Sequence, residues 1–263
     1  MATSMVNGAR LAYDANGVGP PTVWVHGGFT DRRGAAAIAP LLAERRRFIA
    51  YDRRGHGDSE RTPGRQRVAD HVDDLGALLM ALDAAPAHLL GNSDGGEVAI
   101  KLAVRRPELV ASLCVHEPSL YSILPDPPDL AWIATAVAAL ERGDDEAAAR
   151  VVIEDAALGA GAWDALPERT RRAFVHNAPP WLETARDPAY GRIAPEALAA
   201  LTVPTLLTVG GEAFPVDAAI VARLGELLPH ARRHTFADAG HIPHRTHPDE
   251  YARVVAAFLD DVP

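Results

Sequence analysis

The feature that most constrains this chain is the stretch Leu89–Gly96, which reads Leu-Leu-Gly-Asn-Ser-Asp-Gly-Gly. An apolar strand precedes a glycine-flanked serine, Ser93, and a helix-forming run follows it. The Gly-x-Ser-x-Gly spacing is typical of a nucleophile elbow, a tight strand-to-helix turn in which Gly91 and Gly95 leave room where side chains would collide. The Asp94 backbone N–H at the helix start can face a developing oxyanion. The stretch therefore predicts a nucleophilic serine with one oxyanion donor beside it.

Short apolar runs alternate with helical patterns along most of the chain. Expected strands lie at 5–6, 11–13, 22–25, 47–51, 88–90, 109–115, 205–209 and 233–236. Expected helices lie at 34–44, 68–82, 97–105, 217–228 and 249–259. Such alternation predicts an α/β fold, with a mostly parallel sheet and helices on both faces. Because the carboxyl ends of parallel strands share one edge, we expect the active site at that edge.

One region departs from this alternation. Residues 118–195 carry no strand pattern; they are rich in alanine, punctuated by proline and helical in periodicity. We interpret them as a helical cap inserted into an α/β core made of 1–117 and 196–263. The active site would then lie beneath this cap.

Charge and composition narrow the classes of partner. The net charge of −9 argues against nucleic acid, and no apolar stretch is long enough to span a bilayer. Residues 1–10 show no apolar signal-peptide core, so a cytoplasmic protein is expected. The single cysteine, Cys114, lies in an apolar run, where we expect a core residue and not a nucleophile. We expect a small-molecule substrate and no nucleic-acid or membrane partner. The sequence leaves open whether the protein forms a homodimer.

Four motifs stand in the order and approximate spacing of the α/β-hydrolase superfamily, which the chain resembles over nearly its whole length outside the cap. They are His26-Gly27-Gly28, Arg54-Gly55-His56-Gly57-Asp58-Ser59, the elbow at 91–96, and Gly240-His241-Ile242-Pro243-His244. The resemblance implies that Ser93 is the nucleophile and that His241 takes and returns its proton. It also implies that His26 and His56 hold loops together through hydrogen bonds and do not react.

The same resemblance assigns residues to the oxyanion hole and the pocket. Gly28, in the loop after the strand at 22–25, supplies the second oxyanion donor beside the Asp94 N–H. We expect Phe29 and His244 to line the substrate pocket, His244 as a structural neighbour of His241.

The acid of the catalytic triad departs from the common pattern. Most relatives carry an aspartate in the turn after the strand matching 205–209. Here Phe214 occupies that position, and Asp217 lies three residues later. A minority place the acid after the strand that follows the elbow helix, where Glu117 stands. Glutamate fixes a histidine tautomer as well as aspartate does. We therefore expect Glu117 to be the acid, with Asp217 as the alternative, and assign Phe214 to the substrate pocket.

The position of this glutamate narrows the resemblance to fungal lactonases of the zearalenone-hydrolase type. These also have a His-Glu pair after that strand and a cap tryptophan that follows an Asn-x-Pro-like segment. The matching residues here are His116-Glu117, and Trp181 after 177–180. The resemblance implies that Trp181 packs against a flat or hydrophobic substrate. The residues alone leave a role in the cap core equally open.

Residues and resemblance together predict a serine hydrolase that cleaves a carboxylic ester or lactone through an acyl-enzyme. Cleavage of a carbon–carbon bond or an amide by the same triad is an alternative, as is a non-catalytic receptor on this fold. An epoxide hydrolase or haloalkane dehalogenase would need aspartate in place of Ser93. The sequence contains no dinucleotide-binding glycine loop and no cysteine–histidine cluster, so we expect no cofactor and no metal.

Overall fold

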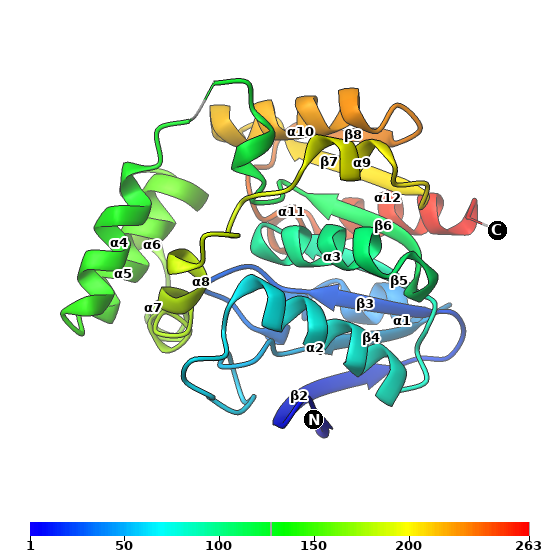
Figure 1. Ribbon diagram of the computed structural model, residues 1–263, viewed down its shortest axis with the longest axis horizontal. Coiled ribbons are helices and arrows are strands. Elements are labelled where there is room, and N and C mark those ends of the chain that lie inside the picture. Colours follow the sequence, from blue (N-terminus) through cyan, green and yellow to red (C-terminus); the bar gives the residue numbers. More distant parts are fainter. Residues whose placement is uncertain (127, 263) are drawn as a thin grey trace.

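The computed structural model describes residues 1–126 and 128–262, and its centre is one eight-stranded sheet (Figure 1). The strands lie in the order β1-β2-β4-β3-β5-β6-β7-β8. β1 and β2 form an antiparallel hairpin, β2 pairs antiparallel with β4, and the strands from β4 to β8 are parallel. The predicted α/β fold is confirmed. The bounds are β1 Ala2–Val6, β2 Ala9–Asn16, β3 Pro21–Val25, β4 Arg47–Tyr51, β5 Ala87–Asn92, β6 Val110–His116, β7 Thr205–Gly210 and β8 Arg232–Phe236.

Helices cover both faces of the sheet, because side chains along each strand point alternately to opposite faces. Val23 and Leu89 belong to the apolar cluster shared with α2, α3 and α10. Trp24 and Leu90 belong to the cluster shared with α1 and α12. Figure 1 shows α2 and α3 in front of the sheet and α1 behind it. The core helices are α1 Ala39–Ala43, α2 Val68–Ala81, α3 Asp94–Arg105, α9 Pro195–Ala199, α10 Pro215–Leu227, α11 Pro243–Thr246 and α12 Pro248–Asp260.

The continuous helix expected over 34–44 is wrong. The segment instead forms a 3₁₀ turn, Arg32–Ala35, and then the short helix α1. Asp31 starts the 3₁₀ turn by accepting a hydrogen bond from the Arg33 N–H at 2.8 Å. Pro40 lies in the first turn of α1, where its missing N–H costs nothing, so it begins a new helix and does not continue an earlier one.

The described residues between 118 and 195, called the cap or cap region below, form helices and no strand. A π-helical turn, Ile153–Ala157, follows α5. These helices share an apolar cluster that includes Trp163, Phe174 and Trp181, and Phe29 from the core joins it. Figure 1 shows them as a group beside the sheet. Their bounds are α4 Ala131–Glu141, α5 Asp145–Val152, α6 Ala162–Ala165, α7 Glu168–His176 and α8 Trp181–Arg186.

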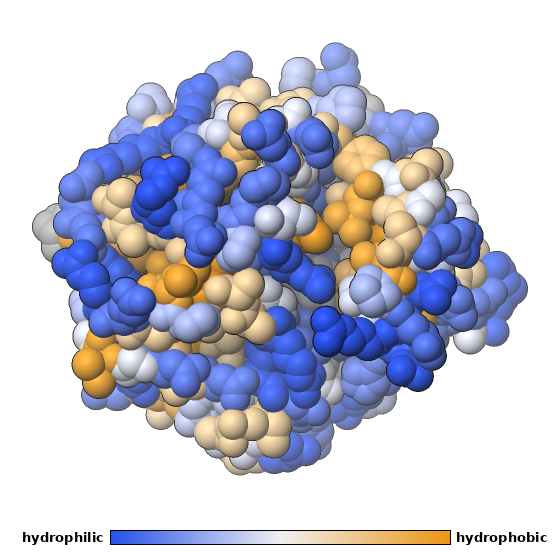
Figure 2. Space-filling view, turned by 180° about the vertical axis from the view of Figure 1, so that it is seen from behind, coloured by the Kyte–Doolittle hydropathy of each residue, from blue (hydrophilic) through white to orange (hydrophobic). Residues whose placement is uncertain are grey.

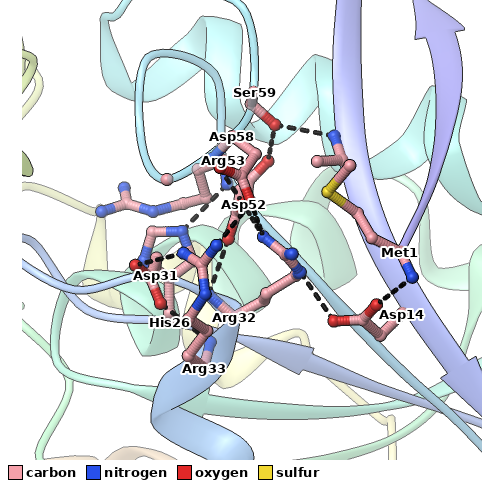
Figure 3. Close-up of polar contacts among 12 residues, drawn as sticks. Met1, Asp14, His26, Asp31, Arg32, Arg33, Asp52, Arg53, Asp58 and Ser59 are labelled. Carbon is pink, nitrogen blue, oxygen red and sulfur yellow. Dashed lines mark hydrogen bonds and ion pairs between the residues drawn. The ribbon is translucent and has the colours of Figure 1, made fainter.

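An ion-pair network centred on the buried pair Arg32 and Asp52 holds the loop that follows β4 (Figure 3). Arg32 donates hydrogen bonds to Asp14 on β2 at 2.7 Å, to Asp52 after β4 at 2.5 Å and to Asp58 at 2.9 Å. The Ser59 hydroxyl closes the loop by donating to the Asp52 carbonyl at 2.7 Å. A buried charge is tolerated only with several such partners. The network therefore fixes residues 52–59 in one conformation.

The reverse face of the molecule is largely hydrophilic. Figure 2 shows hydrophilic residues over much of this face, with apolar residues in separate patches. Within the described residues, no helix has both the length and the apolar character that crossing a membrane requires.

Candidate active site

Ser93 occupies the sharp turn between β5 and α3, as the sequence predicts. Its backbone is strained, with φ 55° and ψ −126°, a conformation that residues other than glycine rarely adopt. The turn is held by the hydrogen bond from the Ser93 N–H to the His116 carbonyl at 3.0 Å. A Cβ at Gly95 would overlap the Val25 carbonyl oxygen. Glycine there lets the elbow press against β3, which raises the half-buried Ser93 to the sheet edge.

His241 and Glu117 form a direct, buried hydrogen bond. Nδ1 of His241 lies 2.6 Å from Oε2 of Glu117, and the other carboxylate oxygen accepts from the Gly210 N–H at 2.8 Å. Glu117 comes immediately after β6 and has a φ of 44°. Because the carboxylate accepts the Nδ1 proton, the neutral imidazole keeps its lone pair on Nε2. This is the tautomer that a general base requires.

The charges around this pair favour a protonated histidine. Burial disfavours the imidazolium, but the Glu117 hydrogen bond and the charges of Asp217 and Glu117 raise the pKa of His241. Burial also acts to raise the pKa of Glu117, yet hydrogen bonds from His116 and His241 hold it well below its ordinary value. Glu117 is thus an ionised partner that stabilises the proton on His241.

Asp217 approaches the same histidine from the first turn of α10. Its Oδ2 lies 3.9 Å from Nδ1 of His241, too far for a hydrogen bond. Burial raises the pKa of Asp217 to about 6, and the Glu117 charge adds to this while His241 opposes it. Both candidate acids therefore reach His241, but only Glu117 bonds to it. The three side chains offer ligand atoms within 4.8 Å of one another, a spacing that could hold a metal ion.

The two expected oxyanion donors face one cavity. Gly28 follows β3, and Asp94 is the first residue of α3, where N–H groups lack helical partners. Among the residues that the structure describes, neither the Gly28 N–H nor the Asp94 N–H donates a hydrogen bond to another group. Both donors are thus available to a ligand oxygen beside Ser93.

The Asp94 carboxylate has a role that the sequence did not suggest. It accepts hydrogen bonds from Ser119 Oγ at 2.8 Å, Tyr190 OH at 2.9 Å and Trp181 Nε1 at 3.1 Å. Ser119 Oγ also lies 3.5 Å from Ser93 Oγ. Tyr190 and Trp181 come from the cap region, so this one buried carboxylate joins the elbow to the cap.

The cavity beneath the cap contains about 780 Å³ of space not filled by atoms, part of it open to solvent. Ser93, Asp217, His241 and His244 line it together with a largely apolar wall. Phe29 and Trp181 pack with ring centres 5.2 Å apart. Trp181 is therefore both a cap-core residue and part of the cavity wall. The wall includes Phe29, Trp132, Ile153, Phe174, Trp181 and Tyr190.

Two pocket assignments from the sequence need comment. Phe214 does not line this cavity; it lines an adjacent surface groove with Glu212 and Pro215, because Pro215 begins α10 and leaves Phe214 outside the helix. The groove shares His241 with the cavity. His244 does line the cavity, but its ring also packs on Trp24, with centres 4.6 Å apart.

His26 and His56 hold the loop that carries Gly28. His26 Nε2 accepts from the Arg53 N–H at 2.9 Å, so its Nδ1–H donates to the Gly27 carbonyl at 2.8 Å. His56 Nε2 lies 2.8 Å from the Gly28 carbonyl oxygen. Burial lowers the pKa of both rings, that of His56 to about 3. Their contacts match the loop-holding role expected of them.

Known proteins resemble this chain over part or nearly all of its length. The model of the alpha/beta hydrolase family matches residues 22–254. The chain is 36% identical over 124 residues to the uncharacterized hydrolase YraK of Bacillus subtilis (strain 168), a match that covers 46% of each protein. It is 28% identical over 273 residues to the sn-1-specific diacylglycerol lipase ABHD11 of Mus musculus, covering 94% of this chain and 83% of that protein. The enol-lactonase from Burkholderia xenovorans LB400 has the same fold, with a TM-score of 0.84, 24% identity, and coverage of 99% and 100%.

Proposed function

The chain belongs to the alpha/beta hydrolase family, and from that premise we propose that it hydrolyses a carboxylic ester or lactone of a small hydrophobic compound through an acyl-enzyme. The observation that carries the proposal is the buried Glu117–His241 hydrogen bond at a cavity that also contains the strained Ser93. An acid–histidine pair that lines the same cavity as a serine hydroxyl is the set of groups that can activate a hydroxyl nucleophile.

The reaction would proceed in two halves. Ser93 Oγ attacks the ester carbonyl carbon while Nε2 of His241 takes its proton, and the Gly28 and Asp94 N–H groups bind the oxyanion. The tetrahedral intermediate collapses, and His241 returns the proton to the departing alcohol. Water then attacks the acyl-enzyme with His241 again as base, which releases the acid and restores Ser93. Glu117 holds the tautomer and stabilises the imidazolium throughout.

The cavity supports a hydrophobic substrate. Its aromatic wall would bury apolar surface at about 25 cal/mol per Å², and the ring of Trp181 would offer a flat face to an aromatic or macrocyclic group. The names of the relatives, a lipase and an enol-lactonase, belong to the same class of ester chemistry. A lactone of the zearalenone type is the narrowest form of this proposal.

Hydrolysis of p-nitrophenyl esters and of aromatic and aliphatic lactones tests the proposal. Wild type should turn over members of this panel and react covalently with a fluorophosphonate probe. Ser93→Ala should lose about 10⁴-fold or more in kcat and all labelling. Ser119→Ala, whose hydroxyl lies 3.5 Å from that of Ser93, is the matched control and should still be labelled. Labelling that survives in Ser93→Ala would contradict the proposal.

A further inference from the structure

Two buried charges flank the loop that carries Gly28, and the proposed mechanism uses neither. One is the Asp94 carboxylate: a Cβ at Gly28 would lie only 2.7 Å from its Oδ2. The other is the Arg53 guanidinium, whose Nη2 donates to the Gly27 carbonyl at 2.9 Å. Arg53 is 1% exposed and Asp94 is 3% exposed. The Gly27–Gly28 segment is therefore close to both a buried cation and a buried anion.

The carboxylate by itself would oppose catalysis. A second negative charge develops beside it when the carbonyl oxygen becomes an oxyanion, and repulsion between like charges is strong where water is excluded. The three side chains that donate to Asp94, those of Ser119, Trp181 and Tyr190, are all neutral. They satisfy its lone pairs but do not cancel its charge.

Arg53 supplies the opposite charge. A guanidinium stays protonated in proteins. Burial lowers the pKa of Arg53, and Asp94 is the charged group that opposes this shift most strongly. No carboxylate that the structure describes lies within ion-pair distance of this arginine. Burying a cation without a contacting anion costs stability. The position of Arg53 next to the Gly27 carbonyl therefore suggests that its charge serves a function.

We propose that Arg53 is a positioning residue for the oxyanion hole: its charge offsets that of Asp94, and its hydrogen bond polarises the peptide that contains the Gly28 N–H. The Gly27 carbonyl and the Gly28 N–H belong to one peptide group. A cationic donor on the carbonyl makes the N–H a stronger donor, because linked hydrogen bonds polarise one another. The His26 Nδ1–H donates to the same carbonyl and adds to this effect. The inference rests on the proposed ester hydrolysis.

Arg53→Met and Arg53→Lys test the inference, since the first removes the charge and the second keeps it. Two quantities are measured: kcat and KM for p-nitrophenyl butyrate, and the Kd of phenylboronic acid, which adds to a serine hydroxyl to form an anionic tetrahedral adduct. Loss of a direct oxyanion donor costs about 10²- to 10³-fold in kcat. Because Arg53 acts through Gly28, we expect Arg53→Met to lose about tenfold in kcat and in boronate affinity, with KM changed less than about threefold. Arg53→Lys should recover most of both losses.

Arg54→Met is the matched control. Arg54 is equally buried, but it pairs with Asp74 at 2.7 Å and not with the loop. We expect its loss to lower the unfolding midpoint and to leave kcat and boronate affinity of the folded protein unchanged. If Arg53→Met does not fold, Arg53→Gln replaces it with the same criteria.

Two outcomes would overturn the inference. One is full kcat and boronate affinity in the uncharged variant. The other is a loss that follows the unfolding midpoint and that lysine does not restore. If the wild type hydrolyses esters in a way that depends on Ser93, either result rejects only the role of Arg53 and leaves the proposed function standing. A wild type that hydrolyses no ester rejects the proposed function itself.

Discussion

At the scale of single residues, Ser93 and Glu117 share an unusual backbone. Both have positive φ, 55° and 44°, and both directly follow neighbouring parallel strands. Such conformations cost about 1–3 kcal/mol each and persist where the surrounding structure enforces them. At Ser93 the strain raises the hydroxyl into the cavity. At Glu117 it turns the carboxylate toward His241 and the Gly210 N–H.

The two carboxylates near His241 should differ sharply in importance. We expect Glu117→Gln to lower kcat by about 10²- to 10⁴-fold, because an amide can stabilise the wrong histidine tautomer. Asp217→Asn should cost less than about tenfold, since its oxygen lies 3.9 Å from Nδ1. Both substitutions keep side-chain size, so unfolding midpoints should stay similar. Steady-state kinetics on one ester measures both losses in kcat. A larger loss in Asp217→Asn than in Glu117→Gln would identify Asp217, on α10, as the acid.

The rate should depend on pH through His241, which acts as a base only when neutral. Its pKa lies above the ordinary 6.5, so it loses its proton only as pH rises beyond that value. We therefore expect kcat/KM to increase with pH through a limb centred above 6.5. Asp217→Asn removes a negative charge that favours the imidazolium, so the limb should shift to lower pH. A pH profile of both proteins measures this, and a shift to higher pH would refute the electrostatic reading.

At the scale of elements, the strands were predictable because short apolar runs between glycine and proline are local signals. The prediction of one helix over 34–44 was wrong because Asp31 and Pro40 start two separate turns.

The candidate site residues Ser93, His241 and Glu117 could be identified from motifs at strand ends. The partners of Asp94 could not, because Trp181 lies 87 residues away and Tyr190 lies 96 residues away. Their meeting depends on how the cap region packs against α3, which no local pattern records. Arg53 was missed because its partner, the Gly27 carbonyl, lies 26 residues away in another loop.

The π-helical turn after α5 should control the length of the acyl group. π-turns are often found at functional sites, and here Ala156 and Ala157 line the cavity. We expect Ala156→Phe to fill part of that space. The ratio of kcat/KM for p-nitrophenyl octanoate to that for the acetate should fall about tenfold. Asp155→Asn, an exposed position in the same turn, is the control. An unchanged ratio in Ala156→Phe would show that the acyl chain lies elsewhere.

At the scale of the whole molecule, α3 helps to fasten the cap region to the rest of the fold. Lys101 on α3 donates to the Ala189 carbonyl at 2.7 Å, and Glu97 accepts from the Gly191 N–H at 2.9 Å. Lys101 and Glu97 also pair at 2.6 Å. Tyr190, between those two cap residues, bonds to Asp94 on the same helix. The helix that begins at the elbow thus also holds the returning end of the cap.

Breaking this attachment should loosen the cap. Lys101→Met removes the hydrogen bonds of Lys101 to Glu97 and Ala189. Burial raises the pKa of Glu97 to about 8, so without its cation this carboxyl takes up a proton, and we expect the free energy of unfolding to fall by about 1–3 kcal/mol. Amide exchange should rise in residues 187–193. Arg105→Met, on the same helix, removes an exposed pair with Asp73 and should cost less than about 1 kcal/mol. Urea unfolding and hydrogen exchange measure both. Equal changes in the free energy of unfolding and in amide exchange for the two substitutions would show that Lys101 does not hold the cap region in place.

The pairing of His241 with Glu117 also decides how the site is distributed along the chain. Ser93, Glu117 and both proposed oxyanion donors precede the cap region, and only His241 follows it. Cleavage between α4 and α8 would give one fragment with the proposed nucleophile, acid and oxyanion donors, and another with the proposed base alone. Neither fragment would hold a complete catalytic set. A chain cleaved in this region would therefore serve as a two-part complementation reporter, because we expect turnover only when the two fragments reassociate.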